Sequence, residues 1–306
     1  MGPASAPGGR LMADPVRLFV FGLGYSATAF AGLMRPRVAS IGGTVRSLEK
    51  AEAFRTRQIA ASVFDGTAPG DSVASALAEA THILVSIAPG AECDPVLLHH
   101  HADIAAARRL RWIGYLSTVG VYGNYGGAWV SERTTPHPRP GRSTQRLEAE
   151  RAWQALAAQC DVPLAIFRIA GIYGPGRNAL KNLAEGRARR IVKPGQVFNR
   201  IHVDDIAATL AAGLEHNAEG IFNLADNQPA PPQDVVAYAA GLMGVPVPPE
   251  TDFETADLSP MARSFYGDNK RVSNRRIVEE LAVLLRYPTY REGLSALWKS
   301  GDWRGD

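Results

Sequence analysis

Cysteine, lysine and long apolar runs are all scarce in this chain of 306 residues. The two cysteines, Cys93 and Cys160, are too few for a disulfide framework, which indicates reduced thiols and a cytoplasmic protein. No run of about 18 apolar residues occurs, so the sequence predicts no membrane span. Residues 1–14 are rich in Pro, Gly and Ala and lack the apolar centre of a signal peptide, so we expect a disordered leader there.

Only five of the 33 basic residues are lysines, and the formal net charge is only +3. So small a charge excess argues against nucleic acid as a partner. Arginine, which supplies the other basic residues, favours fixed, bidentate contacts with phosphate or carboxylate groups. Small anionic ligands are therefore the partners that this composition leaves open.

A glycine motif follows the first apolar run of the chain. The run VRLFVF at 16–21 predicts a strand that is buried on both faces. In the following GLGYSA, the first glycine permits a tight turn and the second lets the backbone approach a pyrophosphate. The alanine keeps the next helix close to the strand, and the helix N-terminus faces the anion. We assign to this cofactor loop Gly22, Gly24, Tyr25, Ser26 and Ala27.

Arg46 suggests which dinucleotide this loop binds. It directly follows the second expected strand, at 38–45. An NAD site usually places an acidic residue at this point, about 20 residues after the glycines. An arginine at that point suits the 2′-phosphate of NADP, so we predict NADP, with NAD the less favoured cofactor. A solvated surface arginine is the alternative interpretation.

Strands and helices continue to alternate through the first half of the chain. We expect strands at 60–64, 82–86 and 111–116, separated by helices at 72–80 and 95–110. This alternation predicts a parallel sheet with helices on both faces, which binds ligands beyond the carboxyl ends of its strands. The loops at that edge should flank the cofactor through Asp65, Ser86, Ala88 and Pro89.

Three consecutive histidines at 99–101 raise the question of a metal site. Neighbouring residues on a helix point in different directions, so one ion would not collect all three side chains. We therefore predict no metal and interpret the run as a solvated or partly packed helix face.

Several motifs, in order and covering nearly the whole chain, resemble the short-chain dehydrogenase/reductase superfamily in its extended, epimerase-like form. They are GLGYSA at 22–27, YLSTVGVYG at 115–123, FRIAGIYGPGRN at 167–178, NRIHVDDIAATLAAGL at 199–214 and GIFNLADNQP at 220–229. The single cofactor-loop pattern, the AWVSE segment at 128–132 and an altered catalytic helix are similar to the atypical group within that superfamily.

The resemblance implies an α/β fold, a Rossmann doubly wound parallel sheet with a smaller C-terminal substrate-binding lobe. The Rossmann core should comprise residues 15–172 and 201–224, and the lobe residues 173–200 and 225–306. Because related proteins often dimerise through the helices after the fourth and fifth strands, the resemblance also allows a homodimer.

The family's catalytic groups are a Ser or Thr that orients the substrate carbonyl, a tyrosine that exchanges the proton, and a lysine. The lysine holds the nicotinamide ribose and lowers the pKa of the tyrosine. Thr118 matches the hydroxyl because it lies four residues before Tyr122, and Ser117 is a weaker candidate. In PGRSTQRLEAE at 140–150, Glu150 fixes the register, so Arg146 matches the lysine and Arg142 matches the tyrosine.

The missing tyrosine leaves the proton donor open. Arg146 can still hold the ribose, but a guanidinium such as that of Arg142 is a very poor proton donor near neutral pH. Arg142 instead binds an anionic substrate group or is a surface residue. A loop tyrosine or water would supply the proton, and the candidates are Tyr122, which we assign to the catalytic set, Tyr125 and Tyr173. His202 is interpreted mainly as a support of the fold.

By resemblance to the family's nucleotide-sugar contacts, we expect the substrate-binding residues on the side of the lobe. Its residues are Arg142, Arg177, Asn178, Asn199 and Arg200. The sequence thus predicts an NADP-dependent oxidoreductase or epimerase-like enzyme for an unidentified small polar substrate. The alternative is a catalytically inactive sensor or regulatory protein that binds NADP(H).

Overall fold

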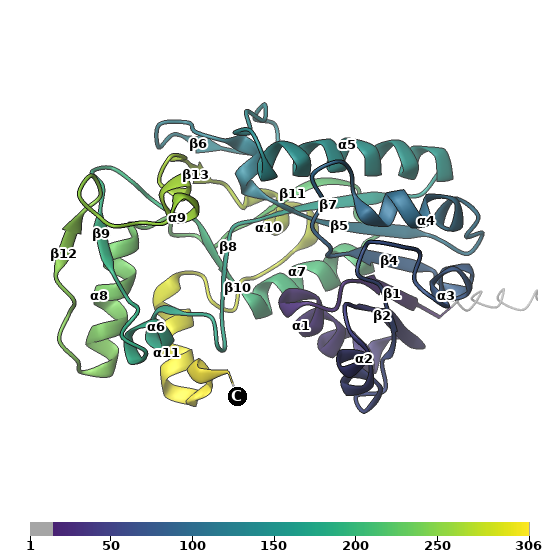
Figure 1. Ribbon diagram of the computed structural model, residues 1–306, viewed down its shortest axis with the longest axis horizontal. Coiled ribbons are helices and arrows are strands. Elements are labelled where there is room, and N and C mark those ends of the chain that lie inside the picture. The colour runs from purple at the N-terminus through teal and green to yellow at the C-terminus, as the bar shows by residue number, and fades with distance from the viewer. Residues whose placement is uncertain (1–14, 306) are drawn as a thin grey trace, which may run out of the picture.

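A computed structural model describes residues 15–305, so the expected leader at 1–14 lies outside the described residues. Seven parallel strands form the central sheet, in the order β11-β7-β5-β4-β1-β2-β3 (Figure 1). This arrangement confirms the predicted parallel α/β sheet. The strands are β1 (Arg17–Phe21), β2 (Ser40–Val45), β3 (Ala60–Val63), β4 (His82–Val85), β5 (Trp112–Thr118), β7 (Leu164–Ile169) and β11 (Gly220–Leu224).

Helices cover both faces of this sheet, and the first strand explains why. Leu18 and Val20 of β1 belong to one buried cluster, whereas Phe19 and Phe21 belong to another, because successive side chains of a strand point to opposite faces. The first cluster includes side chains of α1 (Tyr25–Met34), α2 (Leu48–Arg55) and α7 (Val203–Glu215). The second includes side chains of α3 (Val73–Glu79), α4 (Pro95–Ala105) and α5 (Arg142–Cys160).

Two element boundaries differ from those expected. Helix α4 ends at Ala105 rather than at 110, because Ala107 and Leu110 form a buried turn that leads into β5. Strand β5 runs two residues beyond its expected end, because Ser117 and Thr118 pair with Arg168 and Ile169 of β7. Thr118 is therefore the last residue of a strand and is held in a defined position.

The smaller lobe lies beside the sheet (Figure 1). Its core packs Tyr173, Leu180, Val235 and Leu294 together. Its helices are α6 (Ala179–Ala184), α8 (Pro232–Met243), α9 (Pro260–Phe265) and α11 (Tyr290–Ser300). Its short parallel strand pairs are β8 (Gly171–Tyr173) with β10 (Arg200–His202), and β9 (Arg190–Val192) with β12 (Glu250–Asp252).

One C-terminal stretch packs with the sheet rather than with the lobe. Strand β13 (Arg271–Val272) pairs with β6 (Trp129–Val130), and α10 (Arg275–Leu281) follows it. Val272, Ile277 and Leu281 are buried in a core cluster of the sheet. The structure thus departs from the predicted boundary, which gave all of 225–306 to the lobe, because these apolar side chains are covered by the sheet layer.

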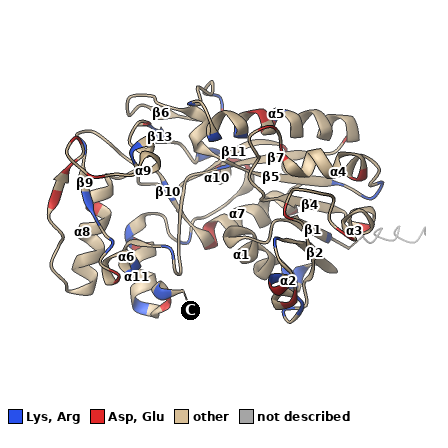
Figure 2. Cartoon of the chain, viewed as in Figure 1, with Lys and Arg blue, Asp and Glu red and all other residues tan. Residues whose placement is uncertain are grey.

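Charge is spread over the whole fold. Basic and acidic segments are interspersed over both the sheet region and the lobe (Figure 2), in keeping with the small net charge of +3. Within residues 15–305, no helix combines the length and the apolar character that crossing a membrane requires.

Candidate functional site

The glycine loop forms an open cradle between β1 and α1. Gly22 has φ +85, and a Cβ there would lie 2.7 Å from the Ile87 side chain, so this turn requires glycine. Gly24 precedes α1 without a side-chain cap, and among residues 15–305 no heavy atom beyond its chain neighbours lies within 4 Å of its Cβ position. Ala27, in the first turn of α1, is fully buried. The first N–H groups of α1 therefore face open space, as an anion site requires.

Tyr25 connects this cradle to the lobe. Its hydroxyl donates to the Pro175 carbonyl oxygen at 2.9 Å, and burial raises the pKa of Tyr25 to about 12. The side chain therefore stays protonated at neutral pH and remains a hydrogen-bond donor. Ser26, the next predicted cofactor residue, is buried.

The other predicted cofactor residues lie at the same sheet edge. Arg46 follows β2 directly and is exposed, Asp65 follows β3, and Ser86 follows β4. Ala88 and Pro89 come next in the β4 loop. Hydrogen bonds from the Thr67 hydroxyl and backbone N–H hold the pKa of Asp65 below its usual range. Because these strands are parallel, their carboxyl ends bring all five residues to one edge.

Helix α5 is fixed against the sheet by a buried ion pair. Glu150 Oε2 lies 2.7 Å from Arg168 Nη2, and both side chains are buried. The Ser117 hydroxyl donates to the same carboxylate, so it has a structural partner. Of the two hydroxyls considered at the end of β5, Thr118 is the one that does not bond to Glu150.

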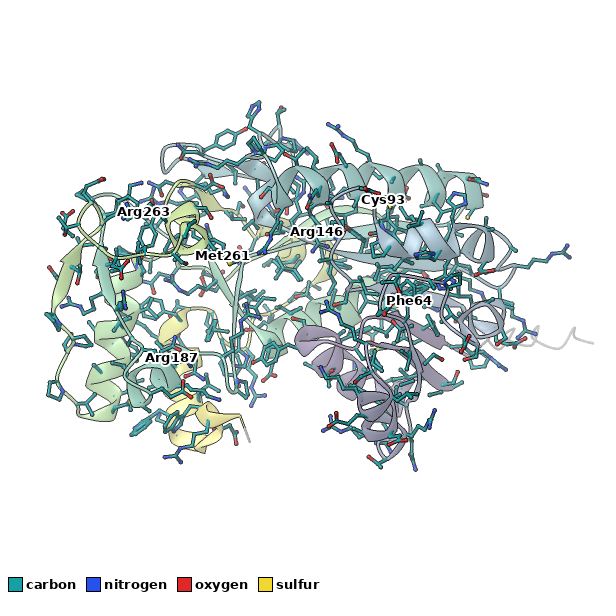
Figure 3. The ribbon with its side chains drawn as sticks, viewed as in Figure 1. Phe64, Cys93, Arg146, Arg187, Met261 and Arg263 are labelled. Carbon is teal, nitrogen blue, oxygen red and sulfur yellow. The ribbon has the colours of Figure 1, made fainter. Side chains whose placement is uncertain are left out.

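Arg146 lies one helical turn before Glu150, at the junction of sheet and lobe (Figure 3). Its Nη1 donates to the Leu116 carbonyl oxygen at 2.7 Å and to the Tyr115 hydroxyl at 3.2 Å. These contacts hold the guanidinium against β5, two residues from Thr118. Among residues 15–305, Nε and Nη2 of Arg146 have no hydrogen-bond partner and remain available to a ligand.

Thr118 and Ser143 both lie beside Gly120. The Thr118 hydroxyl oxygen accepts from the Gly120 N–H at 3.1 Å, which leaves its hydrogen free to donate. The Ser143 hydroxyl oxygen lies 3.0 Å from the Cβ position of Gly120, and that of Thr118 lies 3.3 Å from it. Sequence reasoning missed Ser143, although it directly follows Arg142, the residue that matches the family's tyrosine.

The structure places Tyr122 unfavourably for catalysis, which corrects its assignment to the catalytic set. Its side chain is fully buried and its hydroxyl donates to Asn223 Oδ1 at 2.8 Å. The Arg168 guanidinium lies over its ring at 4.9 Å, and burial raises the pKa of the hydroxyl. An enclosed, bonded phenol of raised pKa neither reaches a substrate nor releases a proton readily.

The other two tyrosines are also engaged within the protein. Tyr125 donates to the Thr135 carbonyl oxygen at 2.5 Å. Tyr173 is buried in the lobe core, its hydroxyl lies 3.4 Å from the Thr289 carbonyl oxygen, and burial raises its pKa. Each of the three tyrosines considered as proton donors, Tyr122, Tyr125 and Tyr173, therefore has its hydroxyl directed to a partner within the protein.

Two predicted substrate residues serve the fold instead. The Asn178 side chain caps α6 by accepting from Lys181 N at 2.9 Å and donates to the Gly174 and Trp303 carbonyl oxygens. Asn199 accepts from Val272 N at 2.8 Å and donates to the Lys270 carbonyl oxygen. These bonds use both sides of each amide, so we correct their predicted role in substrate binding.

The three arginines predicted to grip the substrate do not converge. Arg177 and Arg200 line a cavity of about 280 Å³ between α6, α8 and α11, which Thr118 and Arg146 do not border. Nη1 of Arg200 donates to the Phe198 and Ala230 carbonyl oxygens at 2.9 and 3.1 Å. Arg142 instead lies at the start of α5, with Nη1 3.9 Å from Met261 Sδ of α9. Of these three arginines, Arg142 is the one on α5, the helix that also carries Arg146.

His202 supports the fold, as interpreted from the sequence. Its Nδ1 accepts from Asp204 N at 3.1 Å at the start of α7, and burial lowers the pKa of the imidazole to about 4. The three neighbouring histidines of α4 point different ways, since His100 is buried, His99 contacts the Gly66 carbonyl oxygen and His101 is exposed. Across residues 15–305, no group of three or more His, Cys, Asp or Glu side chains is placed to hold a metal ion.

The fold and the carboxyl edge of the sheet define a class of dinucleotide-binding α/β protein. Its features here are a doubly wound parallel sheet, an open glycine loop after β1 and a free hydroxyl, that of Thr118, at the end of β5. Residues 75–225 match the model of the NAD-dependent epimerase/dehydratase family. The structure also superposes on a functionally unknown conserved protein from Silicibacter pomeroyi, with TM-score 0.85 and 47% identity over 94% of this chain and 99% of that one. The match over residues 75–225 and the shared fold confirm the predicted resemblance to the extended, epimerase-like short-chain dehydrogenase/reductase superfamily.

Other relatives are less similar in sequence. A 3-diazoavenalumate denitrifying reductase from a Streptomyces species is 28% identical over 171 residues, which are 51% of this chain and 54% of that protein. The match therefore spans about half the length of that reductase. A UDP-glucuronic acid 4-epimerase from Bacillus cereus, solved in complex with NAD, has TM-score 0.72 and 14% identity over 92% of this chain and 97% of that one. At that identity, the likeness concerns the fold alone.

Proposed function

We propose that this protein is an NADP-dependent oxidoreductase or epimerase-like enzyme that acts on a small polar substrate. The observation that carries the proposal is the free hydroxyl hydrogen of Thr118, held at the end of β5 at the same sheet edge as the open glycine cradle. A bound nicotinamide would supply or accept the hydride. Thr118 then orients the reacting oxygen by donating a hydrogen bond to it.

Two arginines complete the proposed site. Arg146 supplies a fixed positive charge beside Thr118, and its two free donor groups are available to the ribose hydroxyls. Arg142 begins α5 and is exposed, so its guanidinium suits an anionic group of the substrate. A carboxylate or phosphate on the substrate is therefore favoured.

Cofactor choice is tested by titrating NADPH and NADH into the protein while following cofactor fluorescence. Arg46→Ala should weaken NADPH binding by about tenfold or more, because a charge-assisted contact to the 2′-phosphate is lost, and should leave NADH nearly unchanged. Arg55→Ala is the matched control, since Arg55 is also exposed but lies at the far end of α2. An equal loss for both cofactors in Arg46→Ala would contradict the 2′-phosphate role.

Turnover is tested with generic carbonyl probes, 4-nitrobenzaldehyde and 9,10-phenanthrenequinone, by following NADPH absorbance. Thr118→Ala should lower kcat/KM by about 10²-fold and leave the affinity for NADPH within about twofold, because the hydroxyl contacts the substrate rather than the cofactor. An unchanged kcat/KM in Thr118→Ala would remove this residue from the proposed mechanism.

A second function is favoured by one observation: the residue matching the catalytic tyrosine is Arg142, and the three tyrosines near the site are bonded into the protein. A sensor that binds NADP(H) without turnover would need no proton donor. It predicts NADPH binding that depends on Arg46, together with no reduction of either probe. Reduction of either probe by the unmodified protein would exclude the sensor.

A further inference from the structure

The geometry points to Ser143 as the proton donor that replaces the missing tyrosine, an inference that rests on the proposed reductase function. The family position for the tyrosine is Arg142, and Ser143 is the next residue of α5. Its hydroxyl and that of Thr118 would together contact the reacting oxygen of the substrate.

The two hydroxyls meet across Gly120, which has no side chain to separate them. A Cβ on Gly120 would come within 3.0 Å of the Ser143 hydroxyl oxygen and 3.3 Å of the Thr118 hydroxyl oxygen. The Thr118 Cγ2 methyl also lies 3.3 Å from that position, so both hydroxyl oxygens lie close together beside the same face of Gly120. We place the reacting oxygen of the substrate beside the two hydroxyls, where it accepts a hydrogen bond from each.

Both hydroxyl hydrogens are free to be donated. The Thr118 oxygen is already an acceptor for Gly120 N–H, which directs its hydrogen elsewhere. The Ser143 hydroxyl makes no hydrogen bond with any residue in 15–305. The neighbouring hydroxyls differ in this respect, because Ser117 donates to Glu150 and Thr144 donates to the Arg139 carbonyl oxygen at 3.0 Å.

Apart from the hydride donor and the substrate, the reaction needs only water to balance its atoms and charges. Hydride arrives at the carbonyl carbon, a C–H bond forms, and the π electron pair moves to oxygen. The resulting alkoxide takes the proton of Ser143, and the serine oxygen is reprotonated by water, which leaves as hydroxide. Donor and product are both alcohols of similar acidity, so the transfer is close to balanced in free energy.

The start of α5 suits a transient negative charge on Ser143. Gly141 precedes the helix without a side-chain cap, so the first N–H groups remain unpaired and present partial positive charge. Arg142 and Arg146 lie on either side of Ser143 in the sequence and add two full positive charges to this end of the helix. These groups favour the serine alkoxide until water returns the proton.

The test measures NADPH oxidation with 4-nitrobenzaldehyde and 9,10-phenanthrenequinone, and NADPH affinity by fluorescence, for a set of variants. Ser143→Ala should lower kcat by about 10²-fold or more with NADPH affinity within about twofold. Ser143→Thr, which keeps the hydroxyl, should recover most of kcat. Thr144→Ala is the matched control and should behave as the unmodified protein, because its hydroxyl faces Arg139.

Gly120→Ala is a second, independent variant for the same measurements, and it removes no functional group. Its methyl would occupy the space between the two hydroxyls, so kcat should fall as in Ser143→Ala while NADPH still binds. Full kcat in Ser143→Ala would overturn the inference and leave the proposed reductase intact. NADPH binding without reduction of either probe by the unmodified protein would instead overturn the proposed turnover, and the role of Ser143 with it.

Discussion

Glu150 forms a buried ion pair with Arg168, and Arg146 and Arg142 lie one and two turns before it on α5. Its carboxylate is buried and bonds both Nε and Nη2 of Arg168, at 3.1 and 2.7 Å. The Arg168 Nη1 atom is buried without a partner among residues 15–305. This arginine therefore depends on Glu150 for charge compensation.

Glu150→Gln should lower the free energy of unfolding by about 3–5 kcal/mol, because it leaves Arg168 as a buried, uncompensated charge. Urea unfolding followed by circular dichroism measures the change. Glu148→Gln is the control, since Glu148 is exposed on the same helix and its change should stay within about 0.5 kcal/mol. Similar losses for both variants would show that the buried pair contributes little.

At the scale of elements, two helical glycines lie in opposite surroundings. A Cβ on Gly213 of α7 would lie 2.7 Å from the Phe167 ring of β7, so this glycine lets the helix approach the sheet. A Cβ on Gly241 of α8 would meet no heavy atom within 4 Å. Helix propensity favours alanine over glycine at both positions. Packing against Phe167 opposes alanine at position 213, and nothing comparable opposes it at position 241 among residues 15–305.

Gly213→Ala should therefore lower the free energy of unfolding by about 1–3 kcal/mol through overpacking. Gly241→Ala should raise it by about 0.4–1 kcal/mol, because alanine restricts the unfolded chain and fits the helix. Urea unfolding of the two variants compares them directly. A stabilised Gly213→Ala would mean that α7 moves away from β7 at little cost.

At the scale of the whole molecule, Asp226 lies where the chain leaves the sheet for the lobe. Its backbone N–H donates to the Arg200 carbonyl oxygen at 2.6 Å, and its Oδ1 accepts from Gln228 N at 3.0 Å. Oδ2 is buried with no partner among residues 15–305. Burial raises the pKa of this carboxyl to about 7, and the charges facing it are those of Arg200, Asp205 and Glu292.

This pKa predicts a pH dependence of stability. Between about pH 4 and pH 7 the folded state keeps a proton on Asp226 that the unfolded chain has released, so this group's contribution to the free energy of unfolding falls as pH rises. Asp226→Asn removes the titration. Its free energy of unfolding, relative to the unmodified protein, should therefore rise from pH 4 to pH 7 in urea titrations. Asp71→Asn, at an exposed carboxylate, is the control, and a pH-independent difference for Asp226→Asn would contradict the assignment.

The sequence by itself determined the features that depend on local backbone and spacing. The apolar run at 16–21 and the motif that begins at Gly22 predicted a buried strand, a tight turn and a following helix, because these depend on neighbouring residues only. Alternating elements predicted the parallel sheet. The spacing of Thr118 from Tyr122, and of Arg146 from Glu150, identified the family positions because a helix and a strand repeat at fixed periods.

Only the tertiary structure decided which side chains remain available at the site. Tyr122 is engaged by Asn223, about a hundred residues away in the sequence, and Asn199 by Val272 and Lys270. Ser143 stands out because Gly120 lies across from it without a side chain. Such partners are set by long-range packing, which spacing along the chain does not encode, and the free hydroxyls of Thr118 and Ser143 are what that packing leaves.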